Sequence, residues 1–169
     1  MEQFDQLILP RKDKMFRFAL RMLQNVEDAE DVVQEVLIKI WTNRERLESI
    51  TNLEAWCIQL VKHQAIDRLR TLKRRVEDLD SHYQIKDHEM TPEQKTSGNN
   101  LMEILNNLME SLPEKQKLVI QLRDIEGMAY QEIAEILDIP LNQVKINLFR
   151  ARNILKQKIE QLKLYERAK

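Results

Sequence analysis

The residues best suited to chemistry in this chain are clusters of charged side chains. Six basic residues lie within positions 62–75 and five within 139–158, a stretch that contains no acid. Clustered Lys and Arg side chains suit the phosphates of a nucleic acid. Between them, residues 76–94 carry six acids against one lysine. The formal net charge of −1 therefore hides two cationic segments separated by an anionic one.

Catalytic and metal-binding signatures are missing from the sequence. The single cysteine, Cys57, and three scattered histidines provide neither a disulfide nor a Cys-paired zinc site. Phosphate-loop glycines and a nucleophile elbow are absent as well. We therefore expect no catalytic residues, no metal and no cofactor. No run of eighteen apolar residues and no signal-peptide pattern occurs, which predicts a cytoplasmic protein without membrane insertion.

The elements that position these charges are predicted to be helices. Only two glycines and four prolines occur among 169 residues, too few for the tight turns of a β fold. The expected fold is all-α, with small helical domains at residues 1–73 and 101–169. Residues 74–100, with low hydrophobicity, Pro92 and Gly98, are predicted to form an acidic flexible linker. A docking segment, or a tether that competes with nucleic acid for the basic clusters, is the alternative.

The clearest helix of the first domain covers residues 28–41, where apolar residues recur every three or four positions. Its opposite face carries Asp31, Gln34, Glu35 and Ile38 at i, i+3, i+4 and i+7. An ordinary solvated face with one exposed isoleucine explains each of them singly. As a group they also suit a partner surface, in which an apolar contact is flanked by groups that pair with arginines.

A second long helix is predicted from Leu53 onward. Lys62, Arg70 and Lys73 fall in one sector of its helical wheel, together with His63. This basic stripe is either a solubilising face or a nucleic-acid surface, and its density favours nucleic acid. Trp56 is expected to be half core, with an edge able to stack on an unpaired base.

Residues 130–149 fit the helix-turn-helix pattern. Apolar residues occupy the positions that two such helices bury, and Ala134 stands where they cross. Asp138 takes the turn position, where a left-handed backbone makes glycine usual. The second helix then presents outward the residues Asn142, Lys145, Ile146, Phe149 and Arg150. These suit phosphate contacts and base reading in a major groove, although Ile146 and Phe149 could instead pack against another helix or a protein.

Together the two halves resemble a known family. Residues 28–41 resemble the core-binding motif of bacterial RNA polymerase sigma factors, and Ala55-Trp56 with residues 65–70 resembles their minus-ten segment. Leu112-Pro-Glu-Lys-Gln with residues 130–152 resembles their minus-thirty-five domain. Two such domains and a short linker look like the extracytoplasmic-function (ECF) group.

The resemblance implies a promoter-selecting initiation factor whose partners are core RNA polymerase, promoter DNA and an anti-sigma factor. By motif position, Asp31, Gln34, Glu35 and Ile38 would contact polymerase. The minus-ten element would meet Trp56, Lys62, His63, Arg68 and Arg70, and residues 49–52 would shape a pocket for an unstacked base. The minus-thirty-five element would meet Asn142, Lys145, Ile146, Phe149 and Arg150.

Four positions depart from the family pattern. His63 stands where asparagine is usual, and Gln143, Ile146 and Asn147 replace common residues of the recognition helix. These departures predict an altered promoter preference.

Two other functions are compatible with parts of the sequence. A stand-alone helix-turn-helix regulator with an N-terminal dimerisation domain is the main alternative. The acidic strip around Ile38 argues against it, because a self-associating surface would be more apolar. An enzyme acting on nucleic acid would need a metal cluster or paired catalytic carboxylates, which the sequence lacks.

Overall fold

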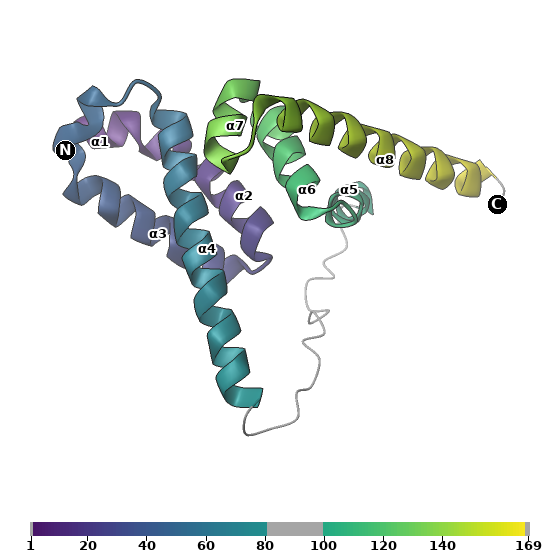
Figure 1. Cartoon of the computed structure of the whole chain (residues 1–169), viewed down its shortest axis with the longest axis horizontal. Helices are drawn as coiled ribbons and strands as arrows, with labels where there is room; N and C mark the ends of the chain where they lie inside the picture. The colour runs from purple at the N-terminus through teal and green to yellow at the C-terminus, as the bar shows by residue number, and fades with distance from the viewer. Residues whose placement is uncertain (1, 81–99, 168–169) are drawn as a thin grey trace.

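The computed structural model describes residues 2–80 and 100–167, all of which form helices or the short connections between them (Figure 1). The predicted all-α fold with two helical domains is confirmed. The first domain consists of α1 (Glu2–Leu7), η1 (Leu9–Arg11), α2 (Lys12–Leu23), α3 (Val26–Thr42), η2 (Arg44–Ser49) and α4 (Leu53–Asp80). The second consists of α5 (Asn100–Glu110), α6 (Glu114–Ile120), η3 (Gln121–Ile125), α7 (Tyr130–Leu137) and α8 (Leu141–Arg167).

The core of the first domain lies where α2, α3 and α4 pack together. The apolar stripe of α3 is buried as predicted at Val32, Val36 and Ile40. On α2 the fully buried residues are Met15, Phe18 and Ala19, whereas Phe16 is only partly buried. Asn25 caps the start of α3, because its side chain accepts a hydrogen bond of 2.9 Å from the backbone N–H of Asp28.

Helix α4 is longer than the predicted domain. It runs to Asp80, so residues 74–80 of the expected linker are helical. Neither glycine nor proline interrupts residues 53–80, and a helix already nucleated by packing propagates easily through such a sequence. The rest of that linker up to residue 99, including three of its six acids, lies outside the described residues.

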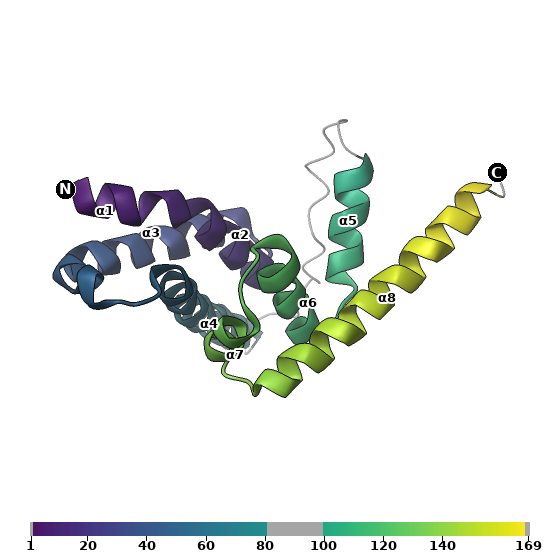
Figure 2. The same cartoon turned by 90° about the horizontal axis from the view of Figure 1, so that it is seen from above.

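The second domain is built around α6, α7 and α8. Helix α6 continues directly into η3, a single π-helical segment, which ends before Gly127. Gly127 has φ +75°, the left-handed conformation expected of a residue that follows a helix. Helix α5 is docked by its C-terminal part: Leu108 and Met109 are buried, while Met102 and Leu105 stay exposed. Helix α8 extends well past the rest of the domain (Figure 2).

The two domains also pack on each other, which the sequence did not predict. Helix α2 contacts α6 and η3, and α7 lies along the first half of α4 (Figures 1 and 2). The contact brings side chains from residues 14–24 next to residues more than 85 positions away in the chain.

Candidate functional site

The strip predicted on α3 is exposed along its whole length. Asp31, Gln34 and Glu35 are exposed, and Ile38 is 65% exposed. The structure adds that its carboxylates have partners on α4. Glu35 accepts a hydrogen bond from Gln64, and Asp31 is 2.8 Å from the Nη2 atom of Arg68. The strip is therefore an oriented polar surface surrounding one apolar side chain.

Four of the five residues predicted to meet a minus-ten element share one side of α4. Trp56 and Lys62 are half-buried, and His63 and Arg70 are exposed. Burial lowers the pKa of Lys62, although the carboxylate of Asp138 opposes this effect. Arg70 lies 3.5 Å from Asp67, one turn away. A basic side chain on this face can neutralise phosphates that run along α4.

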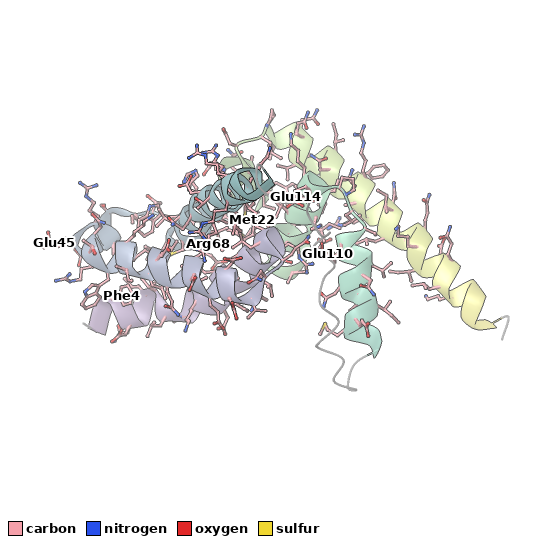
Figure 3. All side chains as sticks on the ribbon, turned by 90° about the horizontal axis from the view of Figure 1, so that it is seen from below. Phe4, Met22, Glu45, Arg68, Glu110 and Glu114 are labelled. Carbon is pink, nitrogen blue, oxygen red and sulfur yellow. The ribbon has the colours of Figure 1, made fainter. Side chains whose placement is uncertain are left out.

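Arg68 lies on the other side of α4, against α3 (Figure 3). Its Nε donates to Asp28 at 2.7 Å and its Nη2 to Asp31 at 2.8 Å. The hydrogen bond to Asp28 is the main cause that raises the pKa of this guanidinium. The structure thus joins a residue predicted to bind DNA to one predicted to bind polymerase.

The helix-turn-helix geometry is present at residues 130–149. Ile133, Ala134, Val144 and Leu148 are buried, as that pattern requires. Asp138 has φ 54° and ψ 52°, so the predicted left-handed turn residue is confirmed. Glu132 accepts a 2.6 Å hydrogen bond from the backbone N–H of Ala129 and so caps α7.

The start of α8 presents an exposed mixed surface. All five predicted residues, Asn142, Lys145, Ile146, Phe149 and Arg150, are exposed there, as are Leu141 and Gln143. Phe149 is 68% exposed and is not packed against the core. The alternative in which its ring packs against another helix of this chain therefore does not apply. Asn147, by contrast, is buried, which makes its departure from the family pattern a matter of packing. Arg152 forms two hydrogen bonds to Asp124, at 2.5 and 3.0 Å, and is thereby held against η3.

Several polar residues of the structure carried no recognisable signal in the sequence. Gln64 joins Lys39 to Glu35, and Asp28 anchors Arg68. Glu126 is buried beside Arg17 of the other domain. The sequence around a polar residue of a helix does not indicate which side chain will be its hydrogen-bond partner. These partners lie on different helices, so the contacts depend on how whole helices pack together.

Within residues 2–80 and 100–167, no three or more His, Cys, Asp or Glu side chains are grouped so as to hold a metal ion. None of the described helices is both long and apolar enough to cross a bilayer.

Two family models match the chain, each on one of the two domains. Sigma-70 region 2 matches residues 7–75, and Sigma-70 region 4 matches residues 102–155. Among curated relatives, the ECF RNA polymerase sigma factor SigW of Bacillus subtilis is 29% identical, over 95% of this chain and 91% of SigW. The ECF RNA polymerase sigma-E factor of Haemophilus influenzae is 30% identical, over 94% of this chain and 88% of that protein.

A solved structure has the same arrangement. The sigma factor RpoE of Bartonella quintana, in complex with the anti-sigma factor NepR, superimposes with a TM-score of 0.76 at 26% identity. The match covers 95% of this chain and 98% of RpoE.

Proposed function

The chain belongs to the ECF group of RNA polymerase sigma factors and directs RNA polymerase to promoters, and we propose that each of its three exposed surfaces binds a different partner. The α3 strip docks on core polymerase. The face of α4 that carries Lys62 and His63 binds the minus-ten element, and the start of α8 binds the minus-thirty-five element. As a polymerase subunit in initiation, the protein acts in the cytoplasm.

The observation that carries this assignment is the exposure of the α3 strip. Ile38, at 65%, is held in place by a helix whose other face is fully buried, and acids surround it. A complex would be stabilised if a partner buried the apolar centre of this surface and paired its arginines with the carboxylates around it. The carboxylates of the strip would repel DNA phosphates, and a self-associating surface would be more apolar, so a protein partner with a basic rim fits it best.

The proposed DNA contacts are of two kinds: contacts to phosphates, which position the protein on the duplex, and contacts to bases, which recognise the sequence. Lys145 and Arg150 suit phosphates, whereas Asn142 suits a base edge, and Ile146 with Phe149 offers apolar contact to thymine methyl groups. On α4, the exposed edge of Trp56 and His63 suits an unstacked base, whose extrusion costs a few kcal/mol. Strand opening at the minus-ten element would draw on these contacts.

An anti-sigma factor is a further proposed partner. RpoE was solved with one bound, and this chain offers an apolar groove of about 1050 Å³ between the two domains. Its apolar lining comes from α2, α5, α6, η3 and α8 and includes Leu20, Leu105, Ile125 and Ile159.

Co-elution with bacterial core polymerase tests the docking surface. The wild-type protein is expected to form a stable complex that the double variant Gln34→Ala/Glu35→Ala loses, while its circular dichroism spectrum is unchanged. Asp5→Ala/Gln6→Ala is the matched control, because it removes an exposed acid–amide pair on α1. Equal binding by all three proteins would refute the assignment of the strip. Failure of the folded wild-type protein to bind would refute the proposed function.

A further inference from the structure

Two side chains of α4 reach the carboxylates of the α3 strip. The side-chain amide of Gln64 donates to Glu35, and the guanidinium of Arg68 donates to Asp31 at 2.8 Å. Gln64 and Arg68 are four residues apart, as are Asp31 and Glu35, so each pair occupies neighbouring turns on one side of its helix. The later acid of α3 meets the earlier residue of α4. The two helices therefore run antiparallel, with these contacts as successive links between them.

The core beneath these links fixes where Gln64 stands. Helices α3 and α4 pack on each other, and the residues next to the linked pair, Val36 on α3 and Ala65 on α4, are both fully buried. Buried side chains in a close-packed core set the rotation of each helix about its axis. Gln64 is itself half-buried, whereas Glu35 is exposed. The amide is thus a support that the core holds in place under an exposed carboxylate.

The amide of Gln64 links two oppositely charged residues of α3. Its Nε2 atom donates to Oε2 of Glu35, and its Oε1 atom accepts from the ammonium of Lys39. Lys39 follows Glu35 by four residues, the spacing and order at which a glutamate and a lysine of one helix attract each other directly. Gln64 gives each of them a partner of its own, so the carboxylate of Glu35 is bonded to a neutral amide.

The two links differ in charge. Arg68 offsets part of the negative charge of Asp31, although it shares its single positive charge with Asp28, to which it donates at 2.7 Å. Gln64 has no charge to offset that of Glu35, yet it fixes the direction of the carboxylate. An arginine of a docking protein would therefore meet a full negative charge that is already ordered. Binding to an ordered side chain avoids the entropy cost of immobilising it.

We infer that Gln64 is a positioning residue for docking on core polymerase: its amide orders the carboxylate of Glu35 and keeps Lys39 from pairing with it. The inference rests on the proposed function, which assigns Glu35 to polymerase. Gln64 acts through Glu35 from the neighbouring helix. Without the amide, Glu35 would turn toward Lys39, and docking would have to separate that pair and order the glutamate side chain.

The test measures the affinity of the full-length protein for core RNA polymerase by surface plasmon resonance. Gln64→Ala is expected to bind about fivefold more weakly than the wild type, because Glu35 must then be ordered and parted from Lys39 on docking. Thr71→Ala is the matched control and should bind as the wild type does. Thr71 lies seven residues further along the same side of α4, and its hydroxyl donates at 3.0 Å to the backbone carbonyl of Asp67 in its own helix.

Two double variants distinguish positioning from a general effect on the fold. In a Glu35→Ala protein, adding Gln64→Ala should weaken binding no further, because the carboxylate that Gln64 orders is already gone. In a Gln64→Ala protein, adding Lys39→Ala should recover part of the lost affinity, because the competing ammonium is removed. Lys39→Ala alone should change the affinity by less than about twofold. An equal loss from Gln64→Ala with and without Glu35, or no recovery through Lys39→Ala, would overturn the inference.

The same measurements separate failure of the inference from failure of the proposed function. If the wild type binds core polymerase, Gln34→Ala/Glu35→Ala does not, and Gln64→Ala binds as tightly as Thr71→Ala, the positioning role is refuted and the docking surface stands. If the folded wild-type protein does not bind core polymerase, the proposed function itself fails.

Discussion

Arg68 of α4 and Asp31 of α3 form an ion pair with 2.8 Å between Nη2 and Oδ2. The same guanidinium binds Asp28 at 2.7 Å. The pair ties the helix assigned to minus-ten DNA to the helix assigned to polymerase. Arg68 thereby orients the α3 strip, and its position on the far side of α4 from Lys62 makes it the least suited of the five predicted residues to touch the same DNA strand.

Replacing Arg68 with alanine is expected to lower the free energy of unfolding by about 1 kcal/mol, because Asp28 loses its charge-assisted partner in a partly buried site. Urea denaturation measures the change. Arg70→Ala is the control, since Arg70 lies 3.5 Å from Asp67 and both side chains are mostly exposed; its effect should stay below about 0.5 kcal/mol. Equal losses of unfolding free energy in the two variants would show that the Arg68 ion pairs stabilise the fold no more than an exposed pair does.

Lys145→Ala and Arg150→Ala are each expected to weaken binding of the holoenzyme to upstream promoter DNA. Each should also reduce the slope of log binding constant against log salt concentration, by the amount that about one phosphate contact contributes. Arg152→Ala should affect DNA binding less, because that guanidinium is engaged by Asp124. Titration of a labelled promoter at several salt concentrations gives both quantities. A larger effect from Arg152 than from Lys145 and Arg150 would contradict the assigned face of α8.

Alanine substitutions at two adjacent residues of α8 are expected to have different effects, one on stability and the other on promoter binding. Leu148→Ala empties a buried site, 2% exposed, and should cost about 2–5 kcal/mol of unfolding free energy. Phe149→Ala should change stability by less than about 0.5 kcal/mol, because Phe149 is 68% exposed, yet it should weaken promoter binding. Thermal denaturation and promoter titration of both variants check the pair. A destabilised Phe149→Ala protein would place that ring in the core.

Stability is expected to fall at high pH through Cys57. Burial raises the pKa of this thiol from 9.0 to about 11, so the unfolded chain ionises first. The contribution is fully present below pH 9 and is lost as the pH rises toward 11, by about 2–3 kcal/mol. Denaturation curves of the wild type and Cys57→Ala between pH 8 and 11 isolate this contribution, since alanine does not titrate. Parallel declines in the two proteins would refute it.

The sequence by itself determined the helical elements and the faces they bury. The spacing of three and four residues in α3, the left-handed turn position at Asp138 and the helix-turn-helix were predicted correctly. These features depend on local backbone preference and on helical periodicity, which a few consecutive residues encode. The outward-facing residues of α8 followed from the same periodicity.

Only the tertiary structure decided how those faces are used in the free chain. It turned Arg68 toward Asp28 and Asp31, buried Asn147, held Arg152 against Asp124 and set Arg17 on Glu126. Each of these contacts joins helices that are separate in the sequence, and a charged residue on a helix gives no sign of which distant acid it will meet. The reason is physical: pairing over long separations follows from the docking of whole helices, whose energy is spread over many apolar contacts.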